Sequence, residues 1–270
     1  MTLEEEQEKT KQEFEHFQQI CENVANLTTK QKNNMYYKMG YIDGMYNKSN
    51  NFFTYLKSRT EFCEKIFAQQ INSVNEFRDN IVEKIADDFV TWHKSEECDI
   101  ELKDEKDCKF TVVGILGELF NIFYLENISS YRTKSGYLKQ FKNVVPFNIY
   151  FKQKDWGADL LCVDEHNEIC VFQVKFYSTW SIMQGHKLEL KKHCFGTMCE
   201  TMRMIYDRYS YLQDHVFVTI LGDKTKDVSI SLQNSPYKSV LTIIDNNKYD
   251  NDTVGNSTLF KDFYKFLCEI

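Results

Sequence analysis

The sequence predicts a mixed α/β fold: an all-helical region of about 105 residues, then a mixed β-sheet flanked by helices. Apolar residues recur at steps of three and four up to about position 105, which is typical of amphipathic helices. After that point, short apolar runs bounded by polar turn residues alternate with helical stretches. We therefore expect two regions, residues 1–105 and residues 106–270, with the sheet in the second.

The composition is that of a globular protein, with 42% hydrophobic and 27% charged residues among 270. Cys194 and Cys199 lie near His193 and suggest zinc, but no Cys-x-x-Cys pair supplies the remaining ligands. The first residues lack the basic and apolar regions of a signal peptide, and no apolar run approaches the ~18 residues that span a bilayer. We expect an intracellular protein without a membrane segment.

The net charge of −7 is unevenly distributed. Residues 1–110 carry 22 acidic and 15 basic side chains, whereas residues 111–270 carry 18 of each. The acidity disfavours DNA contact across most of the surface of the N-terminal helices. Residues 111–270 have no net charge, so their charge does not disfavour a nucleic-acid partner.

The N-terminal region is expected to form a helical bundle. A first helix carries an apolar stripe, a second covers residues 30–46, residues 47–51 break the pattern, and a long helix covers 52–92. The charged segment 94–109 is the expected linker. The bundle either joins two copies in a homodimer or docks on the second region, and both alternatives stay open. The stripe of the first helix consists of Phe14, Phe17, Cys21 and Val24.

The second region reads as a helix, three strands, a helix, two strands and a helix. Its first helix is apolar apart from one acid, Glu118, in Gly117-Glu118-Leu119-Phe120. The expected elements are helix 111–126, strands 144–151, 158–163 and 169–176, helix 181–209, strands 215–221 and 239–244, and helix 259–267.

Strands 158–163 and 169–176 are expected to form a hairpin about the polar tetrapeptide 164–167. A hairpin centred at position 166 places Asp159 opposite Gln173. Side chains alternate along a strand, so Gln173 and Lys175 share one face. An acid, an amide oxygen and an amine thus converge, an arrangement suited to holding a divalent metal ion against a phosphate.

This order of elements resembles the PD-(D/E)xK nuclease superfamily, and the resemblance implies a restriction-endonuclease-like mixed β-sheet flanked by helices. The resemblance rests on a helix with a Glu, a strand that begins with Gly157-Ala158-Asp159 and a strand that ends in Gln173-Val174-Lys175. Gln in place of the usual acid is most similar to the Mrr-like restriction endonuclease branch. The resemblance covers residues 111–245, and residues 1–105 match no family in this way.

The resemblance implies a Mg²⁺ (or Mn²⁺) site. Asp159 would be the principal metal ligand, with Gln173 contributing its side-chain oxygen and Val174 its backbone carbonyl. Glu118 would be an additional ligand or hold a water from the preceding helix. Lys175 would position or deprotonate the attacking water and stabilise charge in the transition state.

Elementary chemistry agrees with these roles. Phosphodiester hydrolysis needs a cation that neutralises charge, and Mg²⁺ prefers hard oxygen ligands while it keeps several waters. Gln173 removes one negative charge from the site, which weakens metal binding. Each residue alone is more simply a solvated side chain or the start of a strand; their order, spacing and facing together favour a site.

The basic residues Lys187, Lys191 and Lys192 on the expected helix 181–209 have two interpretations. They form either an ordinary solvated face or a surface for DNA phosphates. The functional expectation is a Mg²⁺-dependent DNA endonuclease in restriction, defence or genome processing. The alternatives are a catalytically weak nuclease fold that binds nucleic acid or a protein, and a subunit that cuts only within a larger DNA-processing complex.

Overall fold

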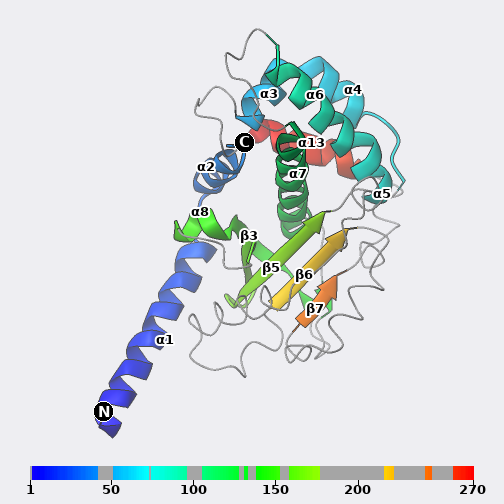
Figure 1. The fold of residues 1–270 in the computed structure, drawn as a ribbon. Helices are drawn as coiled ribbons and strands as arrows, with labels where there is room; N and C mark the ends of the chain where they lie inside the picture. Colours follow the sequence, from blue (N-terminus) through cyan, green and yellow to red (C-terminus); the bar gives the residue numbers. More distant parts are fainter. Residues whose placement is uncertain are drawn as a thin grey trace.

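The computed structural model describes residues 2–41, 51–72, 74–95, 105–127, 131–132, 138–152, 158–176, 216–221, 241–244 and 258–270. Helices gather at one end of the molecule, and a single helix, α7, runs from that group to a mixed sheet (Figure 1). The first helix, α1, extends away from the body. The predicted mixed α/β class is confirmed.

The first two helices begin as their sequences dictate. Both α1 (Leu3–Ala25) and α2 (Thr29–Met39) start with a capping box, in which the threonine before the helix and a side chain three residues on satisfy each other's backbone N–H groups. The second helix was expected to continue to residue 46, but α2 ends at Met39 with Gly40 as its cap, and residues 42–46 lie outside the described part of the chain. A Cβ at Gly40 would lie 2.6 Å from Asn51 Oδ1, so the close approach of residue 51 requires glycine.

The predicted single helix over residues 52–92 is wrong. Arg59, at φ −115°, ends the first segment, and residues 68–72 end the second. A wider π-helical turn then precedes the last segment. The apolar spacing continues across these breaks because every segment buries its own face in the same core. The segments are α3 (Phe52–Ser58), α4 (Thr60–Phe67), α5 (Val74–Phe77), η2 (Arg78–Val82) and α6 (Glu83–His93).

Helix α7 (Glu105–Asn127) is the predicted apolar helix, six residues longer at its start. Lys109 was expected in a linker, but it lies in α7 and forms ion pairs with Glu83 (2.8 Å) and Asp87 (2.7 Å) of α6. By length and composition the stretch Cys108–Asn127 could cross a membrane, which the sequence expectation missed. Most of that stretch is buried inside the protein, as in a core helix.

An aromatic cluster joins the N-terminal helices to the last helix, α13 (Leu259–Glu269). The ring centroids of Phe77 and Phe260 lie 4.5 Å apart in a stacked pair, and Phe263 packs edge-on against Phe120 at 5.4 Å. The predicted boundary near residue 105 coincides with the start of α7. The hydrophobic core nevertheless runs continuously across it.

The sheet has the strand order β3-β4-β5-β6-β7. The first three strands form an antiparallel meander, whereas β6 and β7 continue parallel to β5. The predicted strands from residue 158 onward are thus confirmed. A separate two-stranded ribbon, β1 (Tyr131–Arg132) and β2 (Leu138–Lys139), precedes the sheet. The strands are β3 (Phe141–Pro146), β4 (Leu160–Asp164), β5 (Ile169–Phe176), β6 (Val216–Leu221) and β7 (Leu241–Ile244).

The strand predicted over residues 144–151 needs a correction. The strand is β3, and residues Phe147–Phe151 form the short helix α8. Pro146 has no N–H to continue the ladder, and its φ of −64° suits the entry to a helix. The N–H of Phe147 donates to the carbonyl of Asp159 at 2.9 Å, which fixes the start of α8 beside the start of β4.

The N-terminal helices hold the outer strand of the sheet. Glu126, near the end of α7, accepts hydrogen bonds from Lys32 Nζ (2.8 Å) and from the N–H of Val144 (2.8 Å). The Tyr36 hydroxyl donates to the carbonyl of Val144 at 2.7 Å. The side-chain amide of Asn143 donates to the last carbonyls of α1. Strand β3 is therefore anchored to α1, α2 and α7 together.

His93, at the end of α6, makes the stability of this region sensitive to acid. Its ring is fully buried, neither nitrogen has a hydrogen-bond partner in the part of the chain that the structure describes, and burial lowers the pKa of the imidazole below its ordinary 6.5. The folded protein keeps His93 neutral, whereas the unfolded chain takes up a proton as the pH falls below that value, so stability present above it is lost.

We expect the free energy of unfolding to fall from about pH 7 to about pH 5, and to fall less in a His93→Phe variant, whose ring would pack beside Phe89 without buried nitrogens. Urea unfolding at a series of pH values measures this dependence. The exposed His166→Gln variant is the control and should behave as wild type. Identical pH dependence in His93→Phe and wild type would contradict the assignment.

Candidate active site

The hairpin at the centre of the sheet has the predicted register. Leu160 pairs with Phe172, and Cys162 pairs with Cys170, which places the centre at residue 166. The turn closes through the carboxylate of Asp164, which accepts the N–H groups of His166 (2.9 Å) and Glu168 (2.8 Å). The polar tetrapeptide therefore sets the register from inside the turn.

Asp159 is fixed by its backbone and by its side chain. Its N–H donates to the carbonyl of Phe172 at 2.9 Å, and its carbonyl accepts the N–H of Phe147. Its carboxylate Oδ2 accepts the backbone N–H of Val174 at 2.6 Å. The half-buried Asp159 side chain thus lies against β5, directly before the first residue of β4.

This hydrogen bond defines where the carboxylate lies. Bonds between strands lie in the sheet, and in a continued ladder the N–H of Val174 would meet a backbone carbonyl of the neighbouring strand. The Asp159 carboxylate takes that place just beyond the end of β4. It therefore lies near the plane of the sheet, between its two faces, rather than simply on the same face as Gln173.

Gln173 is buried, with 3% of its surface exposed, and its Oε1 atom has no hydrogen-bond partner among the described residues. Leaving a buried acceptor unpaired costs about 1–3 kcal/mol, so native proteins rarely retain one without a reason. The register places Gln173 one residue beyond the Leu160–Phe172 pair, at the level of Asp159. This end of the hairpin therefore carries a carboxylate next to β4 and an unsatisfied amide oxygen on β5.

Val174 and Lys175 complete the predicted motif along β5. The N–H and C=O of one strand residue point to the same side, so the Val174 carbonyl also points toward the side of Asp159. The Val174 side chain packs in the hydrophobic core. Lys175 pairs with Ile220 in the parallel register with β6, and its side chain lies outside the described part of the structure.

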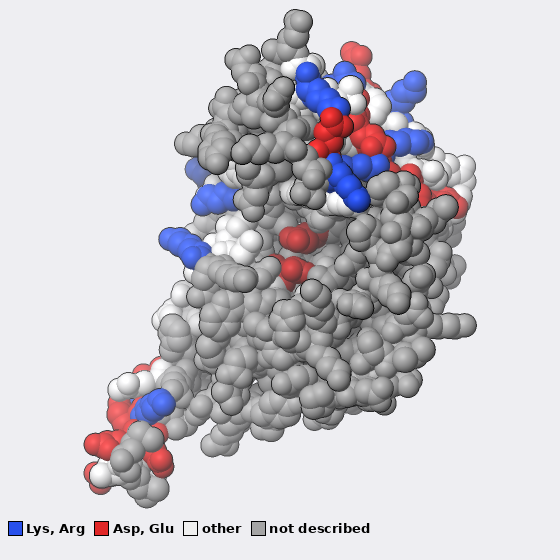
Figure 2. All heavy atoms as spheres, viewed as in Figure 1, with Lys and Arg blue, Asp and Glu red and all other residues white. Residues whose placement is uncertain are grey.

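Glu118 is half-buried on α7, which packs against β3 and β5. Helix α7 covers the sheet face that carries Phe172 and Val174, whereas Gln173 faces the other way. The Asp159 carboxylate lies near the plane of the sheet, so it is the predicted ligand that a side chain on α7, such as Glu118, could approach. In Figure 2, acidic side chains are recessed in the surface where α7 and β5 overlap in Figure 1. The role of Glu118 stays a prediction.

The donors that the structure brings together are oxygens. Among the described residues no group of three His, Cys, Asp or Glu side chains is arranged to hold a metal ion. Gln173 contributes an amide and Val174 a backbone carbonyl, so this candidate does not depend on such a group. One carboxylate with neutral oxygens fits a weakly held Mg²⁺ or Mn²⁺ that retains several waters. The unpaired Oε1 of Gln173 is the observation that this fit rests on.

Several predicted residues lie outside the described part of the chain. They include the basic residues Lys187, Lys191 and Lys192, and the group His193, Cys194 and Cys199 that suggested zinc. Their predictions stand as made from the sequence.

Comparisons with known proteins add no relative. No protein-family model matches the chain, and neither a curated protein nor a solved structure is significantly similar to it.

The sequence analysis missed two features that support the site. The first is Glu126, which anchors β3. An acid at the end of an apolar helix could have indicated it, by the same reasoning that identified Glu118 as a candidate. The second feature is the bond from Phe147 to the Asp159 carbonyl, which Pro146 makes possible by ending β3. A proline at the end of an apolar run could have indicated that break.

The Val174–Asp159 bond gives a stability prediction. Asp159→Ala leaves the N–H of Val174 without its acceptor, which should lower the free energy of unfolding by about 1–3 kcal/mol. Asp159→Asn keeps a side-chain oxygen and should cost less than about 1 kcal/mol. Urea unfolding without divalent metal measures both. Equal stability of the two variants would contradict the assigned bond.

Proposed function

We propose that this chain is a metal-dependent endonuclease that hydrolyses DNA phosphodiester bonds, with a PD-(D/E)xK-like fold of the Mrr-like branch. One observation carries the proposal: the Asp159 carboxylate is held by the N–H of Val174, and the residue before Val174, Gln173, has a buried Oε1 with no hydrogen-bond partner among the described residues. An unpaired buried oxygen is open to a ligand such as a metal ion, which is why this atom supports the proposal.

The topology supports the proposal independently of the side chains. An apolar helix, an antiparallel meander of three strands and a further strand parallel to the third occur in the expected order. The two motif positions fall at the start of β4 and near the end of β5, as the resemblance implies. A random Gln-x-Lys tripeptide would not come with that arrangement.

In this proposal Asp159, Gln173 and the Val174 carbonyl hold the ion, with Glu118 as a further oxygen donor or water holder. A bound Mg²⁺ or Mn²⁺ supplies charge neutralisation at the phosphate and lowers the pKa of a water. Asp159 brings the only charge among the three donors on the hairpin. Metal affinity should therefore be modest and depend strongly on that carboxylate.

The protein residues also direct the reaction. A water oxygen forms a bond to phosphorus, the bond from phosphorus to one ester oxygen breaks, and that oxygen leaves with a proton. Lys175 orients the water, accepts its proton when neutral, or stabilises the charge that develops on the phosphate when protonated. The buried β5 backbone gives Lys175 a fixed starting point, two residues from Gln173.

Plasmid cleavage tests the proposal. We expect purified protein to nick or linearise plasmid DNA with Mg²⁺ or Mn²⁺ and to be inactive with EDTA. Asp159→Asn and Lys175→Ala should each lower the cleavage rate by at least about 100-fold, since each removes a group that acts in the transition state. Glu61→Gln, which removes an exposed acid on α4, should cut at the wild-type rate.

Two outcomes would overturn this proposal. Cleavage that persists in Asp159→Asn would show that another site is responsible. Binding of DNA without cleavage under any divalent metal would instead support the nuclease-like binding protein that the neutral Gln173 also suggests, and activity that requires an added partner would support a subunit of a larger complex.

Gln173 gives a separate prediction for the metal. Gln173→Glu adds a carboxylate and should tighten Mn²⁺ binding at least about tenfold, while it destabilises the metal-free protein by repulsion from Asp159. Gln173→Leu should abolish the stabilisation that Mn²⁺ gives the wild type. Thermal unfolding over a Mn²⁺ titration measures these shifts, because a ligand that binds only the folded state raises stability by mass action.

The exposed Gln18→Glu variant on α1 adds the same charge away from the site and serves as the control. It should respond to Mn²⁺ as the wild type does. If Mn²⁺ stabilises wild type and Gln173→Leu equally, the ion binds elsewhere.

A further inference from the structure

Helix α2 differs in charge from the acidic region around it. Residues 23–42 contain no acidic residue but three lysines, Lys30, Lys32 and Lys38. Lys32 is half-buried and paired with Glu126 at 2.8 Å. Lys30 and Lys38 are exposed, and neither takes part in an ion pair among the described residues. Their charges are therefore available to an anionic partner.

Lys152 extends this basic surface from a second element. It follows α8 in the left-handed conformation (φ 54°), is exposed, and has no ion pair among the described residues. Helices α2 and α8 pack against each other. Basic side chains line the left edge of the molecule in Figure 2, over the position of these helices in Figure 1, whereas acidic and basic side chains are mixed over α4 and α6.

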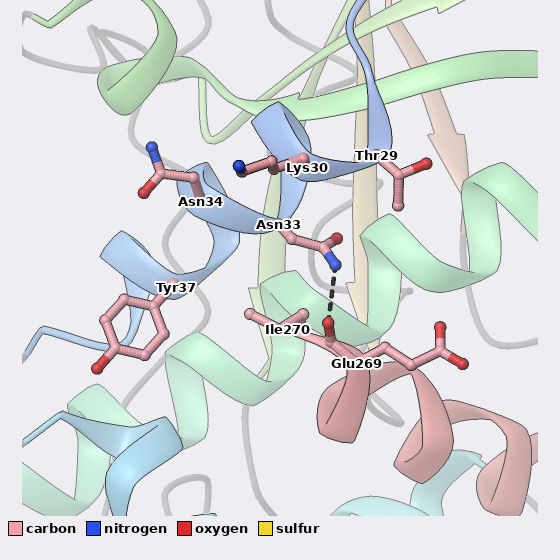
Figure 3. Close-up of a pocket in the computed structure, with 7 residues that line it drawn as sticks. All are labelled: Thr29, Lys30, Asn33, Asn34, Tyr37, Glu269 and Ile270. Carbon is pink, nitrogen blue, oxygen red and sulfur yellow. Dashed lines mark hydrogen bonds between the residues drawn. The ribbon is translucent and has the colours of Figure 1, made fainter.

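Neutral hydrogen-bonding groups surround Lys30. A hollow of about 520 Å³ is lined by Lys30, Asn33, Asn34 and Thr29 together with Tyr37 and the end of α13 (Figure 3). Lys30 and Asn34 extend to the same side of α2, and the Glu269 carboxylate extends away from them. The Asn33 amide donates to the carbonyl of Glu269 at 2.8 Å, so the donors that this hollow offers to phosphate oxygens are the Lys30 ammonium, the Asn34 amide and the Thr29 hydroxyl.

We propose that α2 and Lys152 bind the phosphate backbone of a DNA duplex and present it to the Asp159–Gln173 site. This inference rests on the proposed nuclease function and names the surface that holds its substrate. The basic surface lies close to the site, since α8 begins at the hydrogen bond from Phe147 to the Asp159 carbonyl. Five helical residues cover about 7.5 Å, so Lys152 lies about that far along α8 from this bond.

The dimensions of the surface fit a duplex. The eleven residues of α2 cover about 16 Å, and duplex DNA carries one phosphate charge for about every 1.7 Å of its axis. Several phosphates therefore lie within reach of Lys30, Lys38 and Lys152 at once. Elsewhere the acidic N-terminal helices repel DNA, which confines its approach to this side of the region.

The test compares a Lys30→Gln, Lys38→Gln, Lys152→Gln triple variant with a control triple variant, Lys65→Gln, Lys84→Gln, Lys261→Gln. The control removes the same charge from exposed positions on α4, α6 and α13. Binding of a short fluorescein-labelled DNA duplex is followed by anisotropy in EDTA, which excludes cleavage, over about 50 to 200 mM salt. Circular dichroism and thermal unfolding confirm that both variants fold.

Three phosphate contacts should contribute about 2.7 to the slope of log affinity against log salt, so the slope should fall by roughly that amount in the α2 triple variant and stay unchanged in the control. Affinity near 100 mM salt should fall at least about tenfold. Equal slopes for the two variants would overturn the inference, as would a preference for single-stranded RNA of the same length. If the α2 triple variant loses DNA binding and the wild-type protein never cleaves DNA, the binding surface is supported and the proposed nuclease function is rejected.

Discussion

The pairing register of β4 with β5 is the constraint on which the candidate site depends. A slip of one residue would move every side chain of β4 to the opposite face of the sheet. The carboxylate of Asp164 fixes the register at the turn, and the Asp159 carboxylate ends the ladder at the N–H of Val174. One aspartate thus closes the hairpin at each end, and the one at the open end, Asp159, bonds to the residue that follows the unpaired Gln173.

The helices before residue 105 matter to the sheet because they hold its outer strand. Glu126, Tyr36 and Asn143 join α7, α2 and α1 to β3, whose last residue sets the position of Asp159 through α8. The candidate site and the helical region are therefore mechanically connected. A change in α2 can reach the site through α8 without touching a predicted metal ligand.

Local patterns in the sequence predicted the strands and their order well. The hairpin follows from a polar turn between two apolar runs, and β6 and β7 follow from apolar runs of strand length. The breaks at Arg59 and residues 68–72 could not be predicted, because all segments bury apolar faces in one core and the spacing hides the interruptions. Alternation places Gln173 relative to Lys175, but only packing shows that its amide oxygen is buried and unpaired. Likewise, no periodicity predicts that Glu126 meets Lys32 and Val144.

The aromatic cluster has a consequence for synthesis of the chain. Phe67 and Phe77 pack on Phe263, and about 200 residues separate Phe67 from Phe263. At about 5–20 residues per second, a ribosome needs roughly 10–40 s to make that interval. For that time the helices of the first hundred residues expose aromatic rings that their final partner has not yet covered. The emerging chain is then a natural client for chaperones. The sheet, whose outer strand these helices anchor, is completed late.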